Sequence, residues 1–352
     1  MAAALLVEQG HHVSGVTLRL WDNTGDSGCC SVAEIDDARR VADQVGIDHW
    51  VWTFAEEFEA RVVAPYAAAH AGGLTPNPCI ECNRHLKFGR LLQRARQLGF
   101  DAVATGHHAR VRDDGAGRVR LLRGADRAKD QSYVLYVLGQ DTLSRCLFPV
   151  GEMTKDGVRS RAAAMALRTA AKPDSQDVCF VTTGGGRASF LAPRIDLHPG
   201  RVVDTAGATI GRVDAVELVT VGQRKGLGTG GGGARYALSV DPATGTVVAG
   251  DLGELHTDRV ELGELAWTAG PVEGPACVAG THQPACVAGT HQPACVAGTH
   301  QVQAQSSAHG PAVDATVEGA TVRFARPQRR VAPGQSVVLY CGDEVLGGGI
   351  AR

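Results

Sequence analysis

The chain has 352 residues, enough for two or three domains rather than one compact core. Its 35 Lys and Arg residues balance 37 Asp and Glu residues, which excludes a global positive field, so any RNA contact must come from local patches. Ten irregularly spaced cysteines without a basic leader or a long apolar segment favour a reducing cytoplasm, functional thiols and no membrane partner.

The first part of the chain alternates strand and helix patterns. Helices are predicted over residues 2–9, 32–45, 56–71 and 88–98, and strands over 12–20, 49–54 and 101–105. This alternation predicts a parallel, helix-covered sheet with ligands at the carboxyl ends of its strands. We expect this α/β domain to span residues 1–143.

The remainder divides into two further parts. Residues 144–205 predict a small, mostly helical linker domain, and residues 206–352 a β-barrel of short strands separated by Gly, Pro and Asp turns. A hairpin around Gly342-Asp343 should close it. Four arginines (Arg323, Arg326, Arg329 and Arg330) are either an RNA-binding patch or a solvated strand face.

Two cysteine segments indicate the chemistry. Pro76 and Pro78 stiffen the backbone before Cys79 and Cys82, and a distant lone thiol, Cys179, lies in a short polar turn. One thiol can carry a labile sulfur that the other displaces. A half zinc site or a redox pair is the alternative for Cys79-x-x-Cys82, but no second C-x-x-C occurs, so sulfur transfer is favoured.

Eight motifs in order resemble the tRNA-specific 2-thiouridylases, which thiolate the wobble uridine of certain tRNAs. They are Gly28–Ser31, Thr75–Asn83 with the following Lys87–Gly89, Ala104–Arg110, Lys129–Tyr133, Leu147–Gly151, Ser175–Phe180, Gly222–Gly228 and Leu346–Ile350. The resemblance covers nearly the whole chain. It implies a Rossmann-like adenine nucleotide alpha-hydrolase (PP-loop ATP pyrophosphatase) domain, a linker domain and a β-barrel.

The resemblance also implies residue roles. Cys179 would carry the sulfur as a persulfide delivered by a partner protein, and Cys82 would be the second catalytic thiol, leaving a transient Cys82–Cys179 disulfide. ATP, with Mg²⁺, would adenylate the uridine oxygen. The other implied sites are Leu18 and Gly106 for ATP, Asn77, Pro78 and Cys79 for the target base, and Lys129, Asp130 and Gln131 for tRNA. The pair His107-His108 is expected to serve packing and hydrogen bonding rather than a metal.

Two departures from the family pattern remain. The family's Ser-Gly-Gly-Val-Asp-Ser-Ser phosphate loop does not occur in the sequence, which begins within the following helix. A misplaced gene start is the favoured interpretation and a real truncation the other; the chain as given is expected to bind ATP poorly. The second departure is a perfect nonapeptide, PACVAGTHQ, repeated three times over residues 275–301, which we interpret as a duplication that lengthens a barrel connection.

Two alternative functions stay open. Without the phosphate loop the chain could be a catalytically impaired RNA-binding remnant. Alternatively, Cys29 and Cys30 could join Cys79 and Cys82 in an iron–sulfur site that supports a variant of the thiolation.

Overall fold

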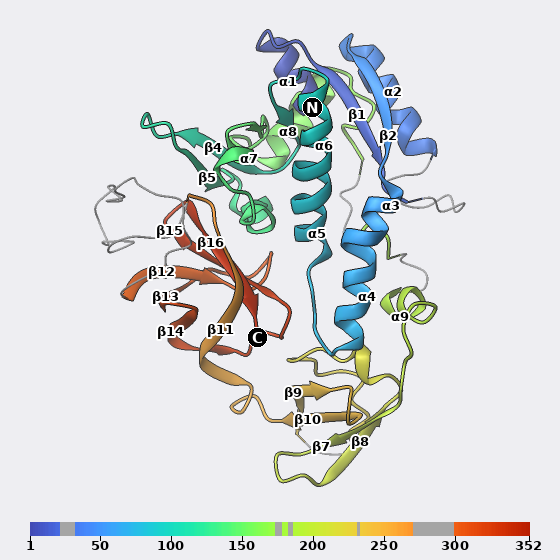
Figure 1. Ribbon diagram of the computed structural model, residues 1–352, viewed down its shortest axis with the longest axis vertical. Coiled ribbons are helices and arrows are strands. Elements are labelled where there is room, and N and C mark those ends of the chain that lie inside the picture. The colour runs from blue at the N-terminus through green and yellow to red at the C-terminus, as the bar shows by residue number, and fades with distance from the viewer. Residues whose placement is uncertain (22–31, 173–177, 182–185, 231–232, 270–298) are drawn as a thin grey trace. The chain divides into compact units, whose positions relative to one another are not determined.

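The computed structural model describes residues 1–21, 32–172, 178–181, 186–230, 233–269 and 299–352. The chain forms two compact units, and each unit contains two separate stretches of sequence. Unit 1 comprises Met1–Val63 and Pro78–Gly186, and unit 2 comprises Ala64–Asn77 and Arg187–Arg352. Figure 1 shows the elements of both units.

Unit 1 begins with the predicted alternation of helices and strands. Helix α1 (Ala2–Glu8), strand β1 (Ser14–Arg19), helix α2 (Val32–Val45) and strand β2 (Asp48–Thr53) follow one another. Strands β1 and β2 pair in parallel, with Ser14 opposite Asp48 and Arg19 opposite Thr53. Gly46 ends α2 with a positive φ of 76°, which glycine adopts without steric cost. This part of the α/β prediction is confirmed.

Two long helical stretches follow, each interrupted by a wider π-helical turn. The first comprises α3 (Ala55–Phe58), the π segment η1 (Glu59–Val63) and α4 (Ala64–Ala71). The second comprises α5 (Pro78–Glu81), the π segment η2 (Cys82–Arg90) and α6 (Leu91–Gln97). Pro65 has no amide hydrogen to donate to the preceding turn, which explains a widened turn directly before it.

The rest of unit 1 supplies a second small parallel sheet and several loops. Strands β3 (Val103–Ala104) and β6 (Cys146–Leu147) pair in parallel, and β4 (Ala109–Asp113) pairs with β5 (Val119–Arg123) as a hairpin. Short helices follow: η3 (Arg127–Lys129), η4 (Ser132–Leu135), α7 (Gln140–Leu143) and α8 (Lys155–Ala164).

In unit 2, helix α9 (Gly186–Leu191) leads into a four-stranded sheet of order β8-β7-β10-β9. Its strands are β7 (Gly200–Val203), β8 (Thr209–Val213), β9 (Tyr236–Asp241) and β10 (Thr246–Gly250), with the 3₁₀ turn η5 (Val216–Leu218) between β8 and β9. These strands share their own apolar core, which includes Val202, Val247 and Leu227. The sequence had assigned strands after residue 206 to the C-terminal barrel, whereas those up to residue 250 belong to this separate sheet.

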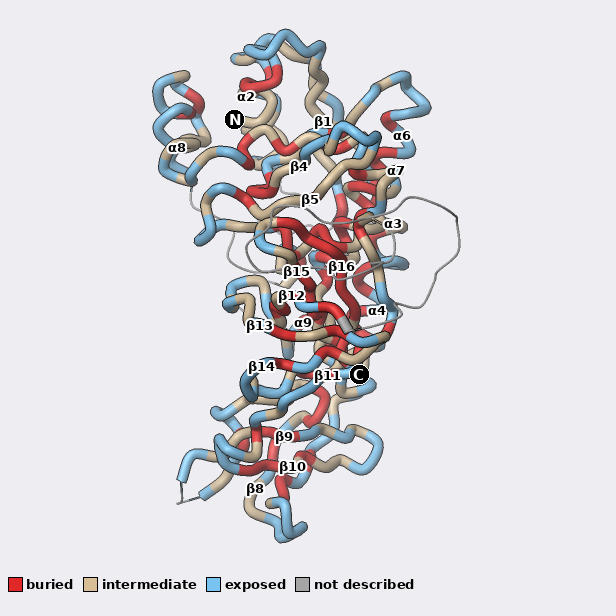
Figure 2. Tube along the Cα trace, turned by 90° about the vertical axis from the view of Figure 1, so that its left-hand side faces the viewer, coloured by how far each residue is buried: buried red, intermediate tan, exposed pale blue. Residues whose placement is uncertain are grey.

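Six strands close into the C-terminal barrel. They are β11 (His256–Trp267), β12 (Thr299–Gln305), β13 (Val313–Glu318), β14 (Thr321–Arg329), β15 (Ser336–Cys341) and β16 (Glu344–Ala351). Their order is β11-β14-β13-β12-β15-β16, and β16 pairs back onto β11. Figure 2 shows β15 and β16 as mostly buried strands. The predicted barrel and its hairpin, with Gly342 at a φ of 58°, are confirmed.

Barrel closure explains the glycines of the Leu346–Ile350 motif. A Cβ on Gly347 would approach the Ala266 carbonyl oxygen to 2.2 Å, and one on Gly349 would approach the Gly263 oxygen to 2.8 Å. The β16 backbone therefore packs against β11 where no side chain fits. Most of the nonapeptide repeat lies outside the described residues; only Thr299–Gln301 of the third copy belongs to β12. In the described part of the chain, every helix is too short or too polar to span a membrane.

Candidate active site

The first pair of candidate thiols lies on a helix. Pro78 opens α5, so Cys79 and Cys82 are one helical turn apart and not on the loop that the two prolines suggested. Cys79 is exposed, and Cys82, the first residue of η2, is buried with 8% of its surface accessible. Asn83 is fully buried and donates from Nδ2 to the Val134 carbonyl oxygen at 3.0 Å. This bond holds the start of η2 in place.

The electrostatics of Cys79 make it a poor nucleophile. Packing around its sulfur raises the pKa of the Cys79 thiol, and the nearby Lys87 ammonium acts in the opposite direction without cancelling the effect. Cys79 is therefore a neutral thiol at pH 7. Such a thiol can pack against a base or donate a weak hydrogen bond, as a residue next to the target base would.

The third thiol lies in an isolated turn. Cys179 is exposed, and the turn is closed by a hydrogen bond from the Val181 amide to the Val178 carbonyl oxygen at 2.9 Å. The polar residues 175–177 that precede it in the motif are outside the described residues. Phe180, directly after the cysteine, is buried. It packs against Phe58 of α3 and against Trp21, which follows β1.

Helix α3 connects the surroundings of the two candidate catalytic thiols. It packs against η2, with Arg90 Nε of η2 3.1 Å from Glu57 Oε1, and its last residue, Phe58, contacts Phe180 beside Cys179. Neither cysteine forms a disulfide among the described residues, and both belong to unit 1. The structure therefore places Cys82 and Cys179 on segments that share one neighbouring helix. The sequence analysis did not predict this aromatic contact. The apolar Phe180 at the end of the Ser175–Phe180 motif was the feature of the sequence that pointed to it.

The two residues expected to bind ATP lie near the carboxyl ends of parallel strands. Leu18 is half-buried near the end of β1, and Gly106 lies two residues after the end of β3. A Cβ on Gly106 would meet no atom within 4 Å, so the fold itself does not require glycine at this position. Open space beside a strand end suits a ligand that approaches the backbone closely. Both positions therefore fit a nucleotide site.

The two histidines after Gly106 are buried in unit 1. The ring of His107 packs against both Phe88 and Phe148, and its Nδ1 is 2.7 Å from the Thr105 hydroxyl. Burial lowers the pKa of His107 to about 3, so the ring is neutral at pH 7. The His108 amide donates to Gln131 Oε1 at 2.9 Å, which joins this loop to the segment expected to contact tRNA.

Within that segment, the three candidate residues differ in their surroundings. Asp130 Oδ1 accepts from the amides of Gly124 and Ser132, and Oδ2 accepts from the Ser132 hydroxyl and from Arg123 Nη1. Its side chain is only 6% exposed. Gln131 accepts the His108 amide hydrogen with its side-chain oxygen, and both Gln131 and Lys129 are exposed. Asp130 and Gln131 therefore shape the loop, and Lys129 lies on its exposed surface.

Other sequence candidates lie elsewhere or outside the described residues. Asn77 ends the first stretch of unit 2 and is bonded in the chain to Pro78 of unit 1. The four candidate patch arginines are exposed on or directly after β14. Cys29 and Cys30 are not among the described residues, and within those that are, no three metal-ligating side chains come together.

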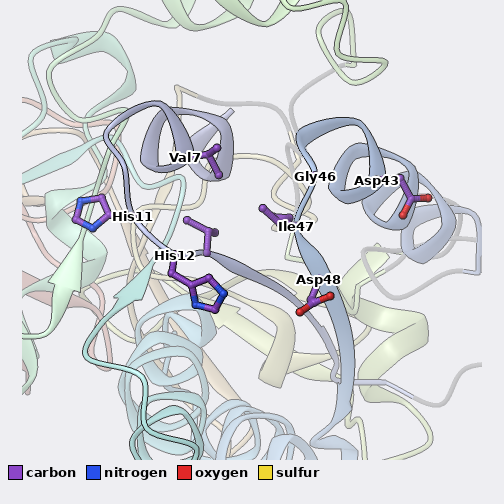
Figure 3. Close-up of a pocket in the computed structure, with 8 residues that line it drawn as sticks. Val7, His11, His12, Asp43, Gly46, Ile47 and Asp48 are labelled. Carbon is purple, nitrogen blue, oxygen red and sulfur yellow. The ribbon is translucent and has the colours of Figure 1, made fainter.

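A pocket of about 480 Å³ lies at the amino ends of β1 and β2, away from the strand ends described above (Figure 3). Its lining includes His11, His12, Asp43 and Asp48, and Figure 3 shows His11 and Asp43 at opposite sides of it. None of the predicted site residues lines this pocket. In open α/β sheets ligands bind outside the carboxyl ends of the strands, so the pocket is not the active site.

Comparisons with known proteins identify the domains and the family. The family model described as the tRNA methyl transferase HUP domain matches residues 1–183. The tRNA methyl transferase PRC-barrel domain matches residues 188–251, and the aminomethyltransferase beta-barrel domain matches residues 282–351. The first is Rossmann-like, and the second coincides with the separate four-stranded sheet of unit 2.

Curated relatives match along the whole length. A tRNA-specific 2-thiouridylase of Chloroflexus aggregans is 44% identical over 363 residues, covering 100% of this chain and 95% of the relative. One of a Roseiflexus species is 43% identical over 377 residues, covering 100% and 96%. One of Beutenbergia cavernae is 44% identical over 367 residues, covering 99% and 90%. The chain therefore belongs to the family of tRNA-specific 2-thiouridylases.

Proposed function

We propose that this chain replaces the 2-oxygen of the wobble uridine in tRNA by sulfur, using ATP to activate the oxygen and a persulfide on Cys179 as the sulfur source. One observation carries the proposal: an exposed thiol and a buried thiol lie on segments that pack against the same helix, α3. The exposed Cys179 suits loading by a partner protein. The burial of Cys82 shields it from external thiols.

The proposed chemistry balances as follows. The uridine oxygen attacks ATP and becomes an adenylate, and pyrophosphate leaves. The terminal sulfur of the Cys179 persulfide then bonds to the base carbon C2. Cys82, as thiolate, attacks the Cys179 sulfur and breaks the S–S bond, so the electron pair passes to the transferred sulfur and AMP departs. The transferred sulfur is reduced, the two cysteines are oxidised to a disulfide, and an external thiol reductant restores them.

The remaining candidate residues take supporting roles in this proposal. Leu18 and Gly106 bind the adenine nucleotide, and Asn77, Pro78 and Cys79 contact the target base once it leaves the anticodon stack. Lys129 contacts tRNA, and Asp130 and Gln131 hold its loop. Mg²⁺ would neutralise the charge of the ATP phosphates when bound.

The test replaces one thiol at a time in a version of the protein with the Ser-Gly-Gly-Val-Asp-Ser-Ser phosphate loop restored. With ATP, Mg²⁺, a persulfide donor and tRNA transcript, Cys82→Ser and Cys179→Ser should each abolish 2-thiouridine, measured by nucleoside mass spectrometry. Cys146→Ser is the matched control, because the Cys146 thiol is buried and donates to the Thr142 carbonyl oxygen. Retained thiolation in either of the first two variants would show that the assignment is wrong.

A second readout separates the alternatives. Pyrophosphate release that depends on tRNA supports the adenylation step, whereas tRNA binding without any pyrophosphate release favours the RNA-binding remnant. Stoichiometric iron and sulfide in anaerobically purified protein, lost in Cys79→Ser, would favour the iron–sulfur variant.

A further inference from the structure

The segment that carries Cys179 is attached to unit 1 by an aromatic cluster of three residues: Trp21, Phe58 and Phe180. The ring centroids of Phe58 and Phe180 are 5.6 Å apart at an interplanar angle of 74°. Trp21 lies 6.4 Å from each of them, edge-on to Phe58 and nearly parallel to Phe180. These distances and angles are those that favour aromatic attraction.

The exposed fraction changes sharply between two neighbouring residues of the turn. Phe58 is 1% exposed and Phe180 7% exposed, yet Cys179, one residue away, is exposed to solvent. Because consecutive Cα atoms are about 3.8 Å apart, fixing the Phe180 ring confines the Cys179 sulfur to a small volume. The Val181 to Val178 hydrogen bond closes the same turn and limits its movement further.

The cluster also connects to the other functional segments of unit 1. Trp21 lies three residues after Leu18, at the carboxyl end of β1, where the nucleotide is proposed to bind. Phe58 belongs to α3, which packs against η2, where Arg90 at the end of η2 donates to Glu57 Oε1 at 3.1 Å. The three rings therefore join the carboxyl end of β1, helix α3 and the Cys179 turn.

We propose that the cluster of Trp21, Phe58 and Phe180 is a positioning device that holds Cys179 in reach of Cys82 and of the activated base. The rings take no part in bond making; they raise the effective concentration of one thiol at the other. This inference rests on the proposed sulfur transfer, and it assigns a role to three apolar residues whose contribution would otherwise be counted only as core packing.

The test compares two reactions of the same sulfur in the full-length protein. Disulfide formation between Cys82 and Cys179 in a glutathione redox buffer depends on their mutual position, whereas alkylation of Cys179 by iodoacetamide depends only on its exposure. Phe180→Ala should lower the effective concentration for the disulfide by about tenfold or more, since two aromatic contacts are lost, and leave alkylation unchanged or faster. Phe180→Leu, which keeps the apolar volume, should give a smaller loss.

Two further measurements keep the outcome decisive. Phe58→Leu should reproduce the loss although it leaves the Cys179 turn unaltered in sequence, and Phe190→Ala, a buried ring of unit 2 that packs against Tyr66, should change neither reaction. An unchanged effective concentration in both Phe180 variants would overturn the proposal. If the unsubstituted protein forms no disulfide, the proposed two-thiol transfer fails. In that case, the rate of hydrogen exchange at the Val181 amide tests separately whether the cluster holds the turn. Phe58→Leu should accelerate that exchange, and an unchanged rate would refute the positioning role.

Discussion

Replacement of Asp130 by Asn tests whether this residue shapes a loop or touches RNA. The carboxylate accepts four hydrogen bonds, at 2.9 Å from the Gly124 amide, 3.0 Å from the Ser132 amide, 2.9 Å from the Ser132 hydroxyl and 3.1 Å from Arg123 Nη1. An amide can keep the two bonds on one oxygen but presents NH₂ to the other two donors. Loss of a charge-assisted bond in a buried ion pair costs about 3 kcal/mol.

The expected result is a lower melting temperature of unit 1. For a unit of this size, about 3 kcal/mol corresponds to a decrease of roughly 6–12 °C, measurable by circular dichroism or by hydrogen exchange of the β4–β5 hairpin. The control is Asp113→Asn, an exposed carboxylate on the same hairpin that accepts one bond, from the Gly115 amide. It should shift the free energy of unfolding by less than about 0.5 kcal/mol. A melting temperature unchanged in Asp130→Asn, together with weakened tRNA binding, would refute the structural role.

Four more expectations follow from particular residues. Lys129→Gln should weaken tRNA binding without changing the melting temperature and should reduce the salt dependence of the affinity by roughly one in log–log slope. The pKa of His107 is about 3 in the folded protein, below its value in the unfolded chain. The stability that neutral His107 contributes is therefore complete above pH 6.5 and falls by about 1.4 kcal/mol per pH unit between pH 6.5 and 3. His107→Gln should remove this pH dependence, measured as the difference between melting temperatures at pH 7 and pH 5. Burial raises the pKa of Cys146 to about 12, so mass spectrometry after iodoacetamide at pH 8 should find Cys179 modified and Cys146 intact. Deleting Pro284–Gln301 leaves one repeat copy and the same residues before Val302. The melting temperature of the barrel should stay unchanged, or rise because the shorter connection costs about 1 kcal/mol less loop-closure entropy. An unfolded barrel would contradict the duplication interpretation.

The sequence by itself determined the order of the first helices and strands and allowed candidate reactive residues to be predicted. The helical periodicity of Val32–Val45, the glycine that ends it and the alternating strands around it all predicted the parallel βαβ unit that the structure has. The hairpin at Gly342 was equally visible, because a two-residue turn between apolar runs is a local property. Cys82 and Cys179 are predicted as the reactive thiols from short motifs, since the residue types that sulfur chemistry needs are few.

Tertiary structure decided what depends on contacts between distant residues. Pro78 is compatible with both a rigid loop and the first turn of a helix, and packing of α5 and η2 chose the helix. Strands of similar length and composition were divided between two sheets by their pairing partners, which no local pattern encodes. The contact between Phe58 and Phe180 and the inward hydrogen bonds of Asp130 likewise exist only after folding, because their partners come from different segments of the chain. The proposed role of Phe58 and Phe180 in positioning a thiol, and that of Asp130 in shaping a loop, therefore could not be predicted from motifs.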